Sequence, residues 1–173
     1  MAKKFIILDT ETTGLEVRQG HKIIEIGAVV LNDRKKSSDH FHAYINPGRA
    51  IDEEASKVHG ISNQDLENEP MFAAIADDFI EFIQGSTLII HNAPFDVGFL
   101  NSELKSVSAK YPKLEDICEI EDSLVLARNK FPGQRNSLDA LANRFEVSGY
   151  DRSFHGALLD ANILADVYIY LTG

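Results

Sequence analysis

Hydrophobic positions near the start of the chain predict a buried strand that ends in acidic residues. Residues 5–8 form an unbroken apolar run, which is typical of a strand covered on both faces. The run leads directly into Asp9 and Glu11, which share one face if the strand continues that far, because side chains alternate along a strand. Residues 12–14 then turn the chain. The plain alternative is a strand that simply ends in solvent.

The pattern of the next residues predicts an antiparallel β-meander. Residues 22–31 are rich in β-branched side chains and predict a second strand. Residues 39–45 alternate and predict a third strand, which ends at the turn signal of residues 46–48. The charged residues 32–36 predict a hairpin turn with solvated basic side chains, and phosphate contact is the alternative for those side chains.

Helical periodicity interrupted by one short apolar run predicts a parallel pairing in the middle of the chain. Residues 52–60 predict a short helix, and apolar spacing over residues 70–85 predicts a longer one with a glycine at its end. Residues 87–90 predict a buried strand, and residues 91–94 turn the chain into a helix that begins near Phe95. Strand, crossover helix and strand in this order are typical of parallel strands.

The last third of the chain is predicted to be mainly helical. Helices are expected over residues 122–130, after the capping residue Ser137, and over residues 156–171, with a loop at residues 151–154. Neither a repeat nor a long linker interrupts the pattern. We therefore expect the α/β class, with a mixed sheet flanked by helices in a single domain over residues 1–173.

Length and composition are those of an ordinary globular protein. The chain has 173 residues, of which 44% are hydrophobic and 25% charged, and no apolar run approaches the ~20 residues of a membrane span. Residues 1–4 lead directly into a strand without the pattern of a signal peptide. The single cysteine, Cys118, excludes an internal disulfide and fits a reducing compartment. These features predict a cytoplasmic location.

The net charge of -10 argues against an extended grip on nucleic acid, which is typical of proteins with a basic face. Action on nucleic acid remains compatible with this charge if metal ions supply positive charge at the site. A larger basic partner could also hold the substrate.

Two further acids and a histidine extend the candidate site. Asp96 follows the strand of residues 87–90, so it lies at the same sheet edge as Asp9 if the two strands are parallel neighbours; an ordinary acid at a helix start is the alternative. Asp160 has apolar neighbours in the last helix, and a buried carboxylate needs a partner. On one helix, His155 and Asp160 would stand about 140° apart. We therefore expect His155 on a loop or first turn that leans toward the site.

Oxygen ligands from carboxylates suit Mg²⁺ or Mn²⁺, and four of them suggest two ions. The cluster offers no cysteine or paired-histidine set for structural zinc. His40 and His42 are assigned to a strand surface. Two ions held by carboxylates can support in-line displacement at phosphorus.

Three motifs, at residues 9–14, 91–96 and 155–160, resemble the exonuclease motifs of the DnaQ-like (DEDDh) 3'-5' exonucleases. Similarity at residues 20–29, 58–61 and 136–141 extends the resemblance over nearly the whole chain, and favours the proofreading epsilon subunits of bacterial DNA polymerase III over the RNA-trimming members. The resemblance implies a ribonuclease H-like fold with a mixed five-stranded sheet.

The resemblance also implies a role for each acid. Asp9 would bridge both metals, and Glu11 and Asp160 would complete the site of the metal that carries the attacking water. Asp96 would support the second metal, which stabilises the leaving 3'-oxygen. His155 would take the proton from the water, since histidine titrates near neutrality.

By the same resemblance, six residues would form the pocket for the terminal nucleotide: Thr12, Leu15, Val58, His59, Asn92 and Phe95. Leu15 and Phe95 can pack on a base without reading its identity. Ordinary core packing is the alternative for Val58 and Phe95.

The expected function is metal-dependent hydrolysis at single-stranded or frayed DNA 3' ends, releasing nucleoside 5'-monophosphates. Trimming of RNA 3' ends and a non-catalytic role in a polymerase assembly are the alternatives. Expected partners are DNA polymerase III alpha-like and theta-like subunits. Epsilon subunits bind the polymerase subunit through a flexible C-terminal tail, whereas this sequence ends at Gly173, so attachment to the polymerase is left open.

Overall fold

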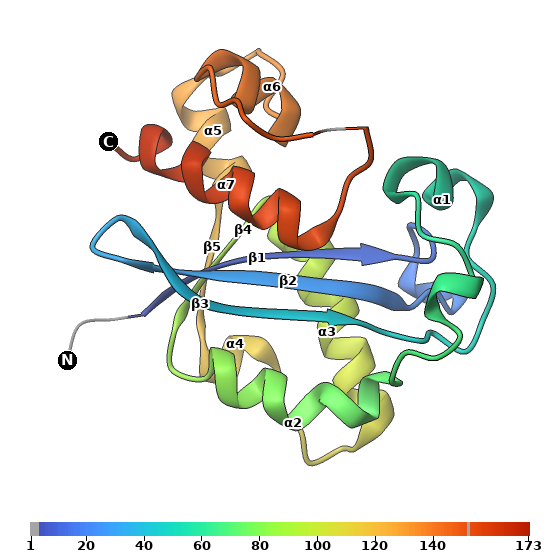
Figure 1. The fold of residues 1–173 in the computed structure, drawn as a ribbon. Coiled ribbons are helices and arrows are strands. Elements are labelled where there is room, and N and C mark those ends of the chain that lie inside the picture. The colour runs from blue at the N-terminus through green and yellow to red at the C-terminus, as the bar shows by residue number, and fades with distance from the viewer. Residues whose placement is uncertain (1–3, 152) are drawn as a thin grey trace.

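A five-stranded sheet of order β3-β2-β1-β4-β5 organises the computed structural model, which describes residues 4–151 and 153–173 (Figure 1). β1 pairs antiparallel with β2, and β2 pairs antiparallel with β3. β4 is parallel to both β1 and β5. The strands are β1 (Phe5–Thr12), β2 (Ile23–Asn32), β3 (Lys35–Tyr44), β4 (Thr87–Ile90) and β5 (Glu119–Asp122). The predicted meander, parallel pairing and mixed sheet are confirmed.

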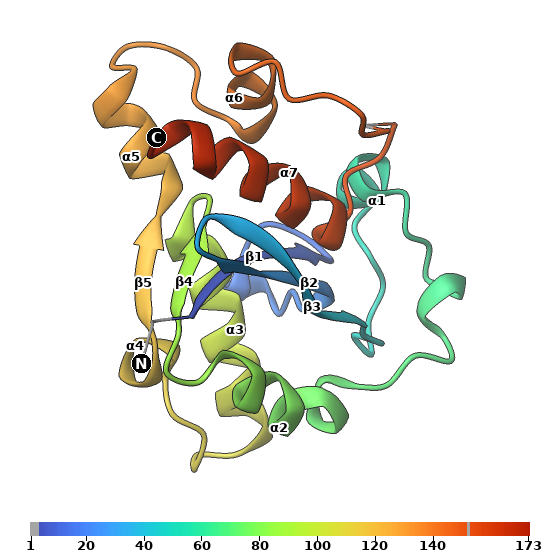
Figure 2. The same cartoon turned by 60° about the vertical axis from the view of Figure 1, so that its left-hand side comes forward.

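Helices cover both faces of this sheet. α2, α3 and α4 lie on one face, and α5, α6 and α7 lie on the other (Figure 1, Figure 2). α1 lies beside the start of α7 in both views. The helices are α1 (Glu53–His59), α2 (Phe72–Ile83), α3 (Ala93–Val107), α4 (Leu114–Ile117), α5 (Ser123–Lys130), α6 (Leu138–Arg144) and α7 (Ala157–Leu171), with 3-10 turns η1 (Val17–Gln19) and η2 (Gln64–Leu66).

Side-chain alternation along β1 decides which helix each of its residues meets. Ile6 and Leu8 are buried in a core with residues of α2 and α3. Ile7 is buried in a separate core with residues of α7. Because the alternation continues to Thr12, Asp9 faces α7 and Thr10 faces α3. The central strand therefore presents its acids to the last helix of the chain.

The hairpin between β2 and β3 is tighter than the sequence predicted. Asp33 and Arg34 form a two-residue turn with φ of 48° and 67°, so β3 begins at Lys35 rather than at residue 39. Arg34 donates to the carbonyl oxygen of Ile169 at 2.5 Å. Lys36 lies 3.1 Å from Asp166. Both residues are exposed, as predicted for this turn, and each also contacts α7.

Two short elements were not foreseen. The strand β5 and the helix α4 lie in a stretch for which the sequence predicted neither. Within residues 4–151 and 153–173, the helices all fall short of the length and apolar character that crossing a membrane requires.

Gly27→Ala is expected to destabilise the fold, because α7 packs directly on β2 at this residue. A Cβ at Gly27 would lie 2.3 Å from the backbone nitrogen of Leu158. The backbone of α7 cannot swing aside as a flexible side chain can, so the helix must shift. Overpacking of this kind costs about 1–3 kcal/mol, and urea unfolding measures it.

Gly98→Ala is the matched control within α3. A Cβ at Gly98 meets nothing within 4 Å. Alanine is the better helix former, so this variant should gain about 0.5–1 kcal/mol of unfolding free energy. A Gly27→Ala protein as stable as the wild type would contradict the close approach of α7 to β2.

Candidate active site

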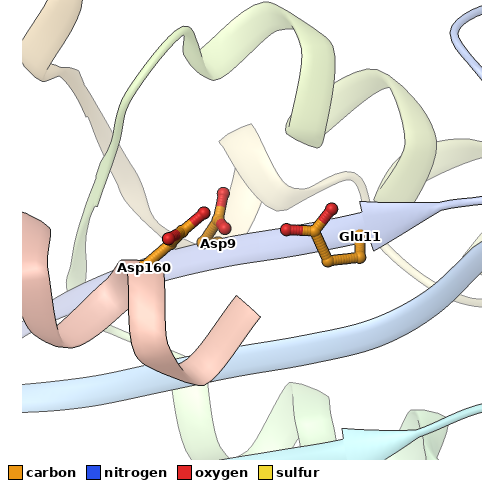
Figure 3. A group of neighbouring side chains, drawn as sticks. All are labelled: Asp9, Glu11 and Asp160. Atoms are coloured by element: carbon orange, nitrogen blue, oxygen red, sulfur yellow. The ribbon is translucent and has the colours of Figure 1, made fainter. Parts of the chain in front are cut away.

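Three carboxylates meet where β1 passes the start of α7. Asp9 and Glu11 project from β1, and Asp160 projects from the first turn of α7 (Figure 3). One carboxylate oxygen of each residue lies within 4.8 Å of those of the other two. The i, i+2 spacing on the strand and the packing of α7 on the same face of β1 produce this group. We call these three residues the acid group.

Electrostatics in the acid group favour a bound cation. Burial raises the pKa of Asp9 well above its ordinary value, and the negative charges of Asp96, Glu11 and Asp160 raise it further. A hydrogen bond from the backbone of Thr10 opposes this increase in the pKa of Asp9 only in part. A divalent cation would relieve the repulsion, and an all-oxygen donor set suits a hard cation such as Mg²⁺. The residues present therefore fit a divalent metal ion.

Asp96 lies outside the acid group, although the sequence placed it at the same sheet edge. It is buried in the first turn of α3, and the hydroxyl of Thr10 donates to its Oδ1 at 2.5 Å. Burial raises the pKa of Asp96 to about 7; the Thr10 bond opposes this shift, and the charge of Asp122 adds to it. The negative charge of Asp96 therefore raises the pKa of Asp9, although Asp96 lies on the α3 side of β1.

His155 lies just before α7, on an irregular segment as the sequence predicted. Its Nδ1 is 3.6 Å from Asp160 Oδ2, and its Nε2 is 3.6 Å from Asp139 Oδ2. The side chain is 35% exposed. His155 therefore stands at the edge of the acid group, with one ring nitrogen toward the acids and the other toward Asp139.

Ligand-binding cavities usually measure about 300–1,000 Å³, and the cavity next to Glu11 measures about 620 Å³. Five of the six predicted pocket residues line it: Thr12, Leu15, Val58, His59 and Phe95. Asn92 does not line it; its backbone N–H donates to Asp122 Oδ1 at 2.9 Å. Since Glu11 is also in the lining, the cavity adjoins the acid group.

The walls of this cavity are apolar and exposed where a base could pack. Leu15 is 80% exposed and Val58 is 49% exposed, so the core alternative for Val58 is wrong. Phe95 is half-buried and packs on Phe99 with ring centroids 4.9 Å apart. A side chain of Phe95 can thus contribute to the core and to the cavity at once.

His59 forms part of the cavity wall with both ring nitrogens in use. The backbone N–H of Ile61 donates to its Nδ1 at 3.0 Å, so its Nε2 carries the proton and faces the carbonyl oxygen of Thr12 at 3.3 Å. Burial lowers the pKa of His59, which keeps the ring neutral. His59 therefore shapes the wall through its ring face, while its nitrogens hold the surrounding backbone.

Glu25 fixes the start of α7, a role that the sequence did not reveal. It is buried on β2, and its Oε1 accepts a hydrogen bond from the backbone N–H of Ala157 at 2.8 Å. Its Oε2 lies 2.6 Å from Nε2 of His42. His40 and His42 are both exposed on β3, as the sequence predicted, and His42 also contacts Glu25. An acid inside the apolar run of residues 23–31 was the available signal.

Glu25→Ala is expected to loosen the start of α7, because the N–H of Ala157 loses its acceptor. A buried donor without a partner costs about 1–3 kcal/mol of unfolding free energy. Glu25→Gln keeps a carbonyl oxygen for this N–H and should lose less stability. Urea unfolding in chelator compares the two variants, and equal losses would argue against the hydrogen bond as the cause.

Comparison with known proteins places this geometry among nucleases. The exonuclease family model matches residues 6–168. DNA polymerase III subunit epsilon of Rickettsia prowazekii (strain Madrid E) is 54% identical over 168 residues, which cover 97% of this chain and 73% of the relative. The protein of the same name from Escherichia coli (strain K12) is 49% identical over 172 residues, covering 97% of this chain and 71% of the relative.

A solved structure shares the fold. Exonuclease X in complex with 5' overhanging duplex DNA superposes with a TM-score of 0.76 at 26% sequence identity, covering 97% of this chain and 90% of that chain. The arrangement of sheet and helices described above is therefore that of a known nuclease.

Proposed function

Because the chain belongs to the exonuclease family, and within it to the DNA polymerase III epsilon subunits, we propose that it proofreads DNA by metal-dependent 3'-5' hydrolysis. The product would be a nucleoside 5'-monophosphate. The resemblance noted in the sequence and the ribonuclease H-like fold that it implied are confirmed. The acid group beside a cavity of about 620 Å³ is the observation that carries the proposal.

Asp9, Glu11 and Asp160 would hold a divalent metal ion, in keeping with the metal dependence of the family. The finer proposal is two ions, Mg²⁺ or Mn²⁺, with Asp96 supporting the second. Bound ions lower the pKa of water and stabilise the charge on attacking and leaving oxygens. The acids themselves would fix the position of that chemistry, since they project from β1 and from the first turn of α7.

His155 would act as the general base. Its Nδ1 faces Asp160, and its Nε2 faces Asp139 at 3.6 Å. A proton taken from water at the acid group would make the ring cationic, and the carboxylate of Asp139 would stabilise that charge. Because the ring is partly exposed, it can pass the proton to solvent after each turnover.

The cavity would hold the terminal nucleotide, with its phosphate end toward Glu11. Leu15, Val58 and Phe95 offer apolar contact, which any base can satisfy. A proofreader must accept every base, so contacts that ignore base identity suit the task. The resemblance assigns Thr12, His59 and Asn92 to the same pocket; for Asn92 this assignment stays a prediction from the sequence.

The proposed substrate is a single-stranded or frayed DNA 3' end. With a net charge of -10, the chain is expected to bind DNA weakly by itself, so a polymerase partner would supply most of the affinity. DNA polymerase III alpha-like and theta-like subunits are the proposed partners. This function also implies the cytoplasmic location that the sequence predicted.

Hydrolysis of a 3'-mismatched DNA primer, compared with an RNA strand of the same sequence, tests this proposal. Each strand is incubated with Mg²⁺, with Mn²⁺ and with chelator. Metal-dependent shortening of DNA from the 3' end, faster at the mismatch, is the expected result. Preferential shortening of RNA would assign the chain to the trimming alternative, and no shortening of either strand would leave only the non-catalytic alternative.

A further inference from the structure

The segment that carries His155 is attached to the wall of the nucleotide cavity. The backbone N–H of His155 donates to the carbonyl oxygen of Val58 at 2.9 Å. The ring of Phe154 lies over Gly60, since a Cβ at Gly60 would stand 2.7 Å from Cδ1 and Cγ of that ring. Two consecutive residues therefore contact the C-terminal end of α1, which provides Val58 and His59 to the cavity.

Gly60 is shaped to receive the ring of Phe154. It ends α1 in the left-handed conformation with φ of 69°, and its N–H donates to the carbonyl oxygen of Ser56 at 2.8 Å. Glycine adopts this conformation without strain and leaves the space beneath the ring open. Phe154 itself is 54% exposed, so its contact with Gly60 buries little area and contributes little to global stability.

The other end of the same segment is attached to the sheet. Gly156 precedes Ala157, whose N–H is held by Glu25 on β2. The segment of residues 154–156 thus connects α7, which is fixed to the sheet, with the C-terminal end of α1 at the cavity. Anything that immobilises the end of α1 also immobilises the backbone of His155.

We propose that Phe154 is a positioning residue that couples His155 to the nucleotide cavity, so that a nucleotide packed against Val58 orders the general base. The inference rests on the proposed function and adds a route by which substrate occupancy reaches the base. Ordering of α1 by the nucleotide lowers the remaining entropic cost of ordering His155. His155, the general base, is then held in place only when a 3' end occupies the cavity.

Phe154→Ala is expected to lower kcat on DNA by about 10–100-fold with little change in KM. The reason is that displacing a catalytic group such as the general base by about 1 Å can lower the rate by up to about 10²-fold. Phe154→Leu keeps an apolar side chain over Gly60 and should recover part of the loss. Tyr170→Ala is the matched control: Tyr170 is 56% exposed and stacks on Phe145 near the other end of α7. Its kcat should equal that of the wild type.

A pair of glycine variants separates the ring contact from backbone strain. Gly60→Ala strains a left-handed residue and displaces the ring of Phe154. Gly133→Ala strains a residue of similar φ, 73°, where a Cβ meets nothing within 4 Å. Only Gly60→Ala should reproduce the kcat loss of Phe154→Ala.

Amide hydrogen exchange of His155 gives a readout that needs no turnover. Thymidine 5'-monophosphate added to the wild type is expected to slow exchange of this amide, which donates to Val58. In Phe154→Ala the nucleotide should leave the exchange rate unchanged. Circular dichroism and urea unfolding confirm that the variant is folded before this comparison is made.

Two results would overturn the coupling: a wild-type kcat in Phe154→Ala, or exchange at His155 that is indifferent to the nucleotide in the wild type. Failure of the proposed function looks different, because the wild type itself would then shorten no DNA. In that case the exchange measurement alone decides whether the cavity and His155 are coupled.

Discussion

Asp9→Asn is expected to reduce hydrolysis of DNA by about 10³-fold or more while making the metal-free protein more stable. The activity loss follows because Asp9 stands in the acid group, and electrostatic stabilisation by bound metal is worth several kcal/mol, at ~1.4 kcal/mol for each tenfold in rate. The stability gain follows because burial and three neighbouring acids disfavour the charge of Asp9. The site thus sacrifices stability for function.

The sign of the pH dependence follows from the same shifts. Asp9 and Asp96 have raised pKa values in the folded state, about 7 for Asp96, against an ordinary value of 3.8. At pH values between the ordinary pKa and the raised pKa, the folded chain holds more protons than the unfolded chain. The unfolding free energy therefore falls as pH rises through this range. In chelator, the wild type should therefore be more stable at pH ~5 than at pH ~7.5, and Asp9→Asn should show a smaller difference.

Urea unfolding at the two pH values, in chelator and in Mn²⁺, measures these effects. Mn²⁺ should stabilise the wild type most at the higher pH, where it competes with fewer protons, and should leave Asp9→Asn unaffected. An Asp9→Asn protein that is less stable than the wild type in chelator would show that the charge of Asp9 does not destabilise the metal-free fold.

His155→Ala is expected to slow turnover by about 10²–10⁴-fold, the usual contribution of a general base. Mn²⁺ binding should persist, because all three residues of the acid group are still present in this variant. Added imidazole should restore part of the rate, since the side chain of His155 is 35% exposed and leaves an accessible space. Initial rates across an imidazole series measure this recovery.

His40→Ala is the matched control for this experiment. His40 is exposed on β3, and its Nδ1 lies 3.2 Å from the carbonyl oxygen of Ser38. Its rate should equal that of the wild type, with or without imidazole. A His155→Ala rate within a few-fold of the wild type would remove His155 from the role of base.

The central strand and last helix could be predicted from sequence because their signals are local. Residues 5–8 form a continuous apolar run that ends at Asp9, and the structure continues the strand to Thr12. The strand β5 gave no such signal. Its four residues, Glu119–Asp122, include a single apolar side chain, Ile120, and the strand forms at the sheet edge by pairing with β4.

The division of the four acids between two faces of β1 needed the tertiary structure. The sequence alone predicted that Asp96 lies at the same sheet edge as Asp9, but this edge does not specify on which face of the sheet Asp96 lies. α3 packs on the face opposite α7, so Asp96 meets Thr10, while Asp160 meets Asp9. Thr10 lies between two acids in the sequence, so its side chain points to the opposite face of β1. Once the faces were known, this alternation indicated which face Asp96 occupies.

Contacts between distant parts of the chain were also beyond local patterns. Glu25 and Ala157 are separated by 132 residues, and Arg34 and Ile169 by 135. Both pairs attach α7 or its end to the β2–β3 hairpin region. Such contacts depend on how helices pack on the sheet, which residue periodicity does not specify.

Calorimetric titration of Mn²⁺ into the wild type, Asp9→Asn and Asp39→Asn at neutral pH tests the metal centre without reference to turnover. Asp39 is exposed on β3, so its variant removes the same charge away from the acid group. We expect equal binding by the wild type and Asp39→Asn. Asp9→Asn should bind more than about 100-fold more weakly, since even an outer hydrogen-bond partner of a ligand is worth about 10–100-fold in metal affinity. Undiminished Mn²⁺ binding by Asp9→Asn would contradict the assignment of the acid group as the metal centre of this exonuclease.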